Sequence, residues 1–284
     1  MRLPRFMRIS AVLALLLGPP CHLTAQQTPT PPPSPNPKTL AQAALQSMIQ
    51  ADDAKTHFTR FDLEHTTNRN QKGKLTSQYT ALYEDTWING LPYKRLVEWN
   101  GKPLTGADLA AEQARYDKAV ADRQKLDIAS RAALRNQKLI NTNIDLNRII
   151  TADYRLSELR QQTLNGQLIH VLEADPQPSL DPAHPIPQRH FEIWITDVDP
   201  VIVRLVWTLL DDEPPTLRDT TFQTEFQMVD GLPLPSHELN HANVPVGNKL
   251  IAVDSEHTYT RYRRFTTTVT LKSTSDPDTP APPN

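Results

Sequence analysis

The alternation of hydrophobic and polar residues predicts that most of this chain forms antiparallel β-strands. A period of two residues runs through positions 56–99 and returns from Tyr154 onward, which places every second side chain on one face of a strand. Asn-Gly or Asp-Gly pairs separate several segments, because these residues accept the positive φ angles of a tight hairpin. The pairs stand at residues 89–90, 100–101, 165–166 and 230–231. The pattern therefore indicates about ten strands.

Two segments have the periodicity or composition of helices instead. Near the start of the expected domain, hydrophobic residues recur every three or four positions and form one stripe. They are Leu40, Ala44, Leu45, Met48 and Ile49. Residues 105–150 contain no proline and are rich in alanine and charged residues, which is typical of a solvated helix that begins after Thr105. The chain is therefore predicted to be α+β, with an N-terminal helix and a long helical insertion at 105–150.

The first 25 residues have the composition of a secretory signal peptide. Three arginines precede an apolar run at residues 9–17, and a short polar stretch ends at Ala25. The apolar run has nine residues, far fewer than the roughly 20 that span a bilayer as a helix. We therefore predict a signal peptide at 1–25, cleavage after Ala25, and a mature protein that lies outside the cytoplasm and does not span the membrane.

Proline-rich segments bound the predicted domain. Residues 26–38 are typical of a semi-rigid spacer and residues 273–284 of a disordered tail, which leaves 39–272 for the domain. The single cysteine, Cys21, lies in the predicted signal peptide, so we expect no disulfide or thiolate metal site in the mature protein. The formal net charge of −2 gives no excess of basic residues, which argues against nucleic acid as a partner.

The strand and turn sequences resemble the outer-membrane lipoprotein-sorting (lipoprotein carrier) superfamily, and in particular its longer secreted bacterial members. The resemblance covers roughly residues 40–272. It is carried by NGKPL at residues 100–104, NGQLIHVLEADP at 165–176, FEIWITDVDPVIVRLVW at 191–207 and FQTEFQMVDGLPLPSHELN at 222–240. It implies a curved, incomplete antiparallel β-barrel whose helices close the concave side.

The same resemblance implies a function. In the carriers of this superfamily the enclosed apolar cavity receives lipid chains, and related members are envelope-stress sensors or lipid-binding proteins. The resemblance therefore implies a periplasmic, non-enzymatic protein that holds a lipid, or the acyl moiety of a lipoprotein, in an apolar cavity between sheet and helices. An envelope protein is a further class of partner that it suggests.

Six aromatic residues on the predicted strands are candidates for a hydrophobic binding site. Such residues ordinarily fill a core. A curved sheet that is too open to fill itself would leave part of the aromatic face as a pocket, which is the functional interpretation. The candidates are Tyr83, Trp87, Tyr93, Trp99, Trp207 and Phe226.

The segment HELNH at residues 237–241 matches the H-E-x-x-H signature of zinc peptidases. In that alternative function, His237 and His241 would bind the metal, Glu238 would be the general base, and Glu256 is available as a third ligand. The chemistry requires a helix, whereas prolines flank the segment and its alternation predicts a strand. Residues four apart on a strand are about 13 Å apart, too far to share one zinc ion. We therefore predict a strand without metal.

A third hypothesis is a cell-envelope sensor or scaffold that binds protein partners through the insertion at 105–150. The sequence contains no G-x-S-x-G nucleophile motif, no P-loop and no dinucleotide-binding fingerprint, and it has only 8 glycines. We therefore expect neither an enzyme nor a bound cofactor.

Overall fold

The computed structural model describes residues 35–134, 154–178, 188–213 and 216–265 of the chain. The strands of this part are β1 (Phe58–Asn70), β2 (Leu75–Ile88), β3 (Leu91–Trp99), β4 (Lys102–Pro103), β5 (Tyr154–Leu164), β6 (Gln167–Pro176), β7 (Arg189–Thr196), β8 (Ile202–Leu209), β9 (Thr221–Val229), β10 (Leu232–Val246) and β11 (Lys249–Arg264). The helices are α1 (Pro37–Ala54), the short 3₁₀ helix η1 (Lys55–His57) and α2 (Gly106–Gln124), and residues 128–134 are also helical.

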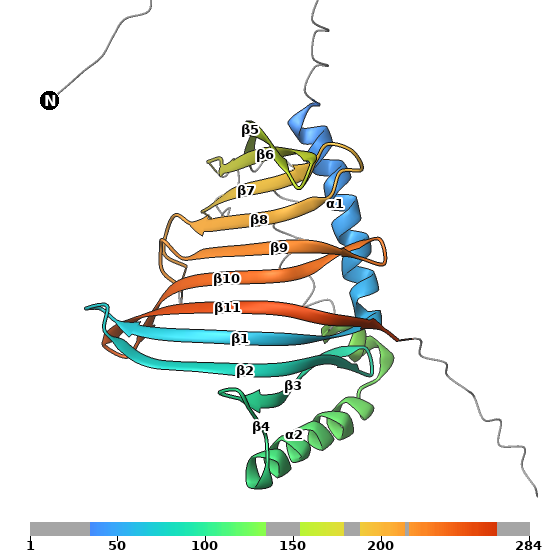
Figure 1. Cartoon of the computed structure of the whole chain (residues 1–284), viewed down its shortest axis with the longest axis vertical. Coiled ribbons are helices and arrows are strands. Elements are labelled where there is room, and N and C mark those ends of the chain that lie inside the picture. The colour runs from blue at the N-terminus through green and yellow to red at the C-terminus, as the bar shows by residue number, and fades with distance from the viewer. Residues whose placement is uncertain (1–34, 135–153, 179–187, 214–215, 266–284) are drawn as a thin grey trace, which may run out of the picture. The chain divides into compact units, whose positions relative to one another are not determined.

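All the named strands belong to one antiparallel sheet of 11 strands, in the order β4-β3-β2-β1-β11-β10-β9-β8-β7-β6-β5. Every pairing joins neighbours along the chain except that of β1 with β11, which brings the first and last strands together in the middle of the sheet (Figure 1). Among the described strands the sheet does not close, because β4 and β5 stand at opposite edges. The predicted fold class, α+β with a curved incomplete antiparallel barrel and an N-terminal helix, is confirmed.

The hairpin signals of the sequence are found where they were predicted. Asn89 and Gly90 connect β2 to β3 with φ angles of 50° and 76°, and Asn165 and Gly166 connect β5 to β6 with φ angles of 51° and 80°. Two consecutive positive φ angles define the type I′ turn, whose twist matches that of the flanking strands. Local residue chemistry therefore accounts for the register of these hairpins.

Helix α1 begins at Pro37, so its first two residues overlap the predicted spacer 26–38. The side chain of Asn36 caps it by accepting a hydrogen bond of 2.9 Å from the backbone N–H of Lys38, and Pro37 suits the first turn because its missing N–H would have no helical partner. The helix crosses the sheet from β5, β7 and β8 to β10 (Figure 1). We call the face of the sheet that α1 covers the inner face, and the opposite one the outer face.

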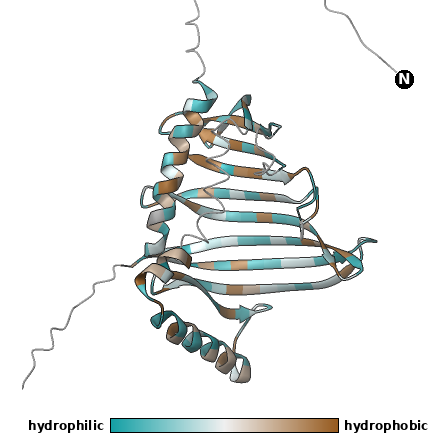
Figure 2. Ribbon diagram, turned by 180° about the vertical axis from the view of Figure 1, so that it is seen from behind, coloured by the Kyte–Doolittle hydropathy of each residue, from teal (hydrophilic) through white to brown (hydrophobic). Residues whose placement is uncertain are grey.

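The main hydrophobic core lies between α1 and the inner face of β5–β8. The helix contributes its predicted stripe, and the strands contribute large residues such as Phe191, Leu172 and Ile193, which are almost fully buried. The stripe residues buried in this cluster are Leu40, Ala44, Leu45 and Met48. Figure 2 shows hydrophobic residues gathered on α1 and on the strands at this end of the sheet, whereas β1 and β2 are more hydrophilic.

The predicted insertion is helical over part of its length. Thr105 precedes α2 as expected, although its side chain makes no capping hydrogen bond, and the helix ends at Gln124 before the second helical stretch at 128–134. Helix α2 lies along β3, where Arg115 and Arg123 donate hydrogen bonds of 2.8 and 2.8 Å to the carbonyls of Lys94 and Pro92. These arginines satisfy backbone groups at one edge of the sheet.

Several predictions concern residues outside the described part. They are the signal peptide 1–25, most of the spacer 26–38, the end of the insertion at 135–150 and the tail 273–284. Within the described residues, no helix combines the length and the hydrophobicity needed to cross a bilayer.

Candidate functional site

A cavity of about 670 Å³ lies between the C-terminal half of α1 and the inner face of the sheet. Its size falls in the range of roughly 300–1,000 Å³ that is usual for small-molecule sites. Met48 and Ala51 of α1 line it on one side. The strands β7–β10 supply six large hydrophobic residues, which we call the apolar wall. They are Phe191, Leu205, Trp207, Phe222, Phe226 and Leu234.

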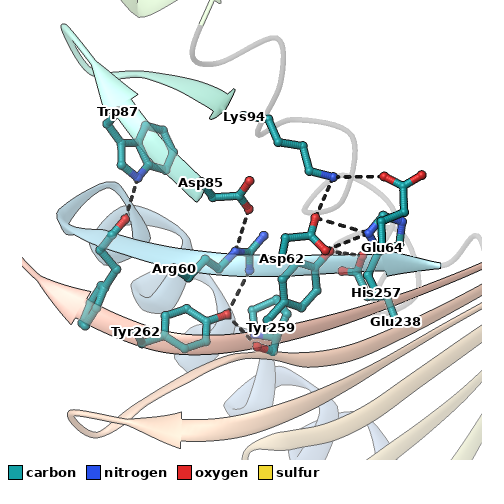
Figure 3. Close-up of polar contacts among 12 residues, drawn as sticks. Arg60, Asp62, Glu64, Asp85, Trp87, Lys94, Glu238, His257, Tyr259 and Tyr262 are labelled. Atoms are coloured by element: carbon teal, nitrogen blue, oxygen red, sulfur yellow. Dashed lines mark hydrogen bonds and ion pairs between the residues drawn. The ribbon is translucent and has the colours of Figure 1, made fainter. Parts of the chain in front are cut away.

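The opposite side of the cavity is polar and is centred on Arg60 of β1 (Figure 3). Its guanidinium group donates a hydrogen bond of 2.9 Å from Nε to Asp85 of β2 and another of 2.9 Å from Nη1 to the hydroxyl of Tyr262 on β11. The same group lies 3.7 Å from the centre of the Tyr259 ring, which is close enough for a cation–π interaction. Three strands therefore hold the guanidinium in one orientation.

Asp62, two residues further along β1, is the most buried acid of this region. Its carboxylate accepts hydrogen bonds from Lys94 Nζ of β3 at 2.6 Å and from His257 Nδ1 of β11 at 3.0 Å. Burial by itself would raise the pKa of Asp62, but the hydrogen bonds from His257 and Lys94 outweigh it and hold the pKa below its usual value. Burial would likewise lower the pKa of His257, but the bond and charge of Asp62 raise it above its usual value. Both shifts therefore favour the charged forms of the two groups.

Two further carboxylates face this side and are held by hydroxyl groups. Glu64 accepts a hydrogen bond of 2.7 Å from Tyr79, and Lys94 Nζ lies 3.6 Å from its other oxygen. Glu238 of β10 accepts a hydrogen bond of 2.6 Å from Tyr259 (Figure 3). Burial raises the pKa of Tyr259, so its hydroxyl keeps the proton that it donates to Glu238.

These ionisable groups form one cluster, which we call the inner polar cluster. It consists of Arg60, Asp62, Glu64, Asp85, Lys94, Glu238 and His257. Four carboxylates stand against two permanent cations and one histidine. The net charge of the cluster is therefore negative whether or not His257 is protonated.

Four of the six predicted aromatic residues lie at the cavity. Tyr93 has a second role there, because its hydroxyl donates a hydrogen bond of 3.1 Å to Glu112 and its ring meets Tyr116 of α2 edge-on. Trp87 donates from its indole N–H to the carbonyl of Phe58 at 2.9 Å. The four residues are Trp87, Tyr93, Trp207 and Phe226. Their contact with a ligand stays a prediction.

The structure places the other two predicted residues away from this cavity. Lys94 Nζ lies 4.3 Å above the ring of Tyr83, which makes Tyr83 a support of the inner polar cluster. Trp99 is 42% exposed, stacks on Tyr79 with ring centres 4.8 Å apart, and borders a second cavity of about 430 Å³ between β3 and α2. These two residues and the other four do not share one pocket.

The sequence analysis did not predict the inner polar cluster, although the alternation of residues along β1 contained one indication of it. Arg60, Asp62 and Glu64 alternate with Phe61 and Leu63, so the charges share one face of β1. That face is the inner one, and Leu63 lies on the outer face with 44% exposure. Alternation separates the two sets of side chains without showing which set faces inward, because the sheet pattern is the same for both.

The HELNH segment forms part of strand β10, as predicted, and the zinc-peptidase alternative is wrong. His237 and His241 lie four residues apart on the outer face, where His237 Nε2 is 2.8 Å from Glu256 and His241 Nδ1 is 2.6 Å from Asp254. Glu238 points to the other face, toward Tyr259. On this strand the two histidines are too far apart to share one metal ion, and Glu238 lies on the opposite face from both of them. A zinc peptidase needs all three groups on one side of a helix. The described residues contain no group of three or more histidines or acids arranged to hold a metal ion.

Comparisons with known proteins match solved structures alone, since no protein-family model and no curated protein matches the sequence. One is a DUF1329 family protein from Desulfovibrio piger, with 10% identity, a TM-score of 0.34, and coverage of 81% of this chain and 94% of that one. Another is a LolA superfamily protein from Nitrosomonas europaea, with 10% identity, a TM-score of 0.31, and coverage of 78% and 94%. A third is an outer membrane lipoprotein-sorting protein domain from Vibrio parahaemolyticus, with 12% identity, a TM-score of 0.33, and coverage of 82% and 95%.

Two of these names belong to the superfamily that the sequence resembles. At identities of 10–12% and TM-scores of 0.31–0.34, no residue role, ligand or partner is carried from these structures to this chain.

Proposed function

We propose that this protein is a periplasmic, non-enzymatic binding protein that holds the acyl chain of a lipid or lipoprotein in the cavity beneath α1. The observation that carries the proposal is the apolar wall, where six large hydrophobic residues line a space of about 670 Å³. Burying an acyl chain there would stabilise the complex by about 0.8 kcal/mol for each methylene removed from water.

The arrangement of α1 supports this proposal. In the first half of the helix, Leu40, Ala44 and Leu45 fill the space above β5–β8. In the second half, Met48, Ala51 and Asp52 line the cavity, and Asp52 pairs with Lys55 of η1 at 2.5 Å. A small side chain and a paired charge leave room between helix and sheet that hydrophobic residues would otherwise fill.

The proposal is tested by purifying the mature protein from a bacterial envelope and examining it by native mass spectrometry and lipid extraction. We expect a bound species with an acyl chain. Leu205→Trp would extend into the cavity from the apolar wall and should remove most of that species. The matched control is Leu63→Trp, the same substitution at an exposed position on the outer face.

Overpacking a core commonly costs about 1–3 kcal/mol of stability, so circular dichroism and urea unfolding are used to check that both variants fold. The proposal fails if the wild-type protein carries no acyl species and also binds no added decanol or dodecanol. It also fails if the two variants retain equal amounts of lipid.

The envelope-sensor hypothesis stays a prediction. It concerns the insertion at 105–150, of which residues 135–150 lie outside the described part. Deleting residues 106–148 and comparing partner capture from an envelope extract would test it separately from lipid binding.

A further inference from the structure

Resting on the proposed function, we infer that the ligand is an amphiphile whose polar end carries a protonated amine, and that Glu238 binds this amine. The apolar wall would contact the chain, and the residues of the inner polar cluster that line the cavity would contact the head group. The inference concerns the chemical class of the ligand, which the shape of the cavity alone does not determine.

Most charges at the cavity are already matched by a partner of opposite sign. Arg60 pairs with Asp85 at 2.9 Å, and Lys94 pairs with Asp62 at 2.6 Å. Likewise, Arg189 Nη2 of β7 lies 2.8 Å from Glu213. These pairs leave little net charge at the sites that they occupy, so they do not by themselves select a charged ligand.

Glu238 differs from the other acids that line the cavity. Its partner is the neutral hydroxyl of Tyr259, and none of the described residues forms an ion pair with it. A carboxylate beside an apolar wall loses much of its hydration, and a charge-assisted hydrogen bond from a cation compensates for that loss. The negative charge of Glu238 itself acts in the same direction, because it attracts a cation and repels an anion.

The position of Glu238 fits the head of a chain that lies along the apolar wall. On the inner face, Glu238 of β10 is paired with Thr224 of β9, which is paired in turn with Leu205 of β8. Neighbouring strands are about 4.8 Å apart, so Glu238 and Leu205 stand about 10 Å from each other along this row. An amine at Glu238 would therefore have its chain directed across Thr224 onto Leu205.

The orientation of Glu238 is fixed before any ligand arrives. Tyr259 donates to one of its oxygens, and the ring of Tyr259 is held beneath the guanidinium of Arg60. A carboxylate that is already oriented loses less conformational freedom on binding than a free side chain does.

The inference is tested with three ligands that share a chain and differ in the head group. Dodecylamine, dodecanol and dodecanoate are titrated into the lipid-stripped mature protein near neutral pH by calorimetry, each below its solubility limit or micelle concentration. We expect dodecylamine to bind about tenfold more tightly than dodecanol, because a hydrogen bond between charged groups typically contributes that much, and dodecanoate to bind most weakly.

Glu238→Gln should remove the preference for the amine over dodecanol, because the amide carries no charge while it keeps an acceptor for Tyr259. The control variant is Glu256→Gln, on the outer face of the adjacent strand, which should keep the preference. Equal affinities for the three ligands, tighter binding of dodecanoate, or an unchanged preference in Glu238→Gln would each overturn the inference and leave the proposed function standing. Failure of all three ligands to bind, together with the absence of an acyl species on the purified protein, would overturn the proposed function itself.

Discussion

Replacing Asp62 by alanine is expected to destabilise the protein because it removes the acid that joins three strands. Asp62 is 1% exposed and accepts hydrogen bonds from Lys94 Nζ at 2.6 Å and from His257 Nδ1 at 3.0 Å. Without its carboxylate, Lys94 of β3 and His257 of β11, which is a second cation when it is protonated, would face each other across β1. The perturbation therefore removes two charge-assisted hydrogen bonds and leaves both donors without their shared acceptor.

The size of the effect follows from the exposure of the partners. Removing one member of a fully buried ion pair costs about 3–5 kcal/mol. The side chain of Lys94 is 38% exposed and has Glu64 at 3.6 Å, so water and the second acid recover part of that loss. We expect the free energy of unfolding to fall by about 2–3 kcal/mol. Asp62→Asn keeps the shape and one acceptor oxygen and should lose less.

The pH dependence has a sign that the two pKa shifts determine. The lowered pKa of Asp62 stabilises the fold above the usual value of 3.8, and this contribution is lost as the pH falls through the folded-state pKa. The raised pKa of His257 stabilises the fold fully below the usual value of 6.5, and this contribution is lost as the pH rises through the folded-state pKa. The pair should therefore contribute most between these two values.

Urea unfolding followed by tryptophan fluorescence, in mildly acidic and in alkaline buffer, measures both effects. The wild-type protein should lose more stability than Asp62→Ala when the buffer is changed from mildly acidic to alkaline. The control is Asp254→Asn, which breaks the outer-face pair of Asp254 with His241, where both side chains are nearly half exposed, and should cost less than about 1 kcal/mol. The reasoning is refuted if Asp62→Ala costs no more than this control, or if its stability changes with pH as that of the wild type does.

Three further predictions use the same unfolding assay. Leu45→Ala should cost about 2–5 kcal/mol because Leu45 is 5% exposed in the core under α1, and a change below 1 kcal/mol would show that this core is loosely packed. Gly90→Ala should cost about 1–2 kcal/mol, since Gly90 has a φ of 76° and alanine is strained there whatever the space around it. The double variant of His237 and His241 to alanine should change stability by less than about 1 kcal/mol, and added zinc should not raise the melting temperature of the wild type, because the two rings share no ion on a strand.

The elements of this fold that depend on neighbouring residues were predictable. Asn89 and Gly90 specify a tight turn through their own φ preferences, and the stripe of α1 is a property of one helix. The strand at 237–241 followed from its alternation and its flanking prolines, in spite of a motif that suggests a helix. Each of these predictions needs only the few residues around the position concerned.

The site depended on contacts between distant parts of the chain. Pairing of β1 with β11 places Asp62 opposite Tyr259, and pairing of β11 with β10 places Glu238 opposite His257, although these residues are far apart in sequence. Local propensity does not specify which strands pair, because many antiparallel partners satisfy the same alternation. The direction in which β1 faces was also open, since a charged inner face is favourable only after partners from three strands surround it. The sequence by itself determined strands, turns and the opening helix, whereas the meeting of an apolar wall with charged groups in one cavity required the assembled sheet.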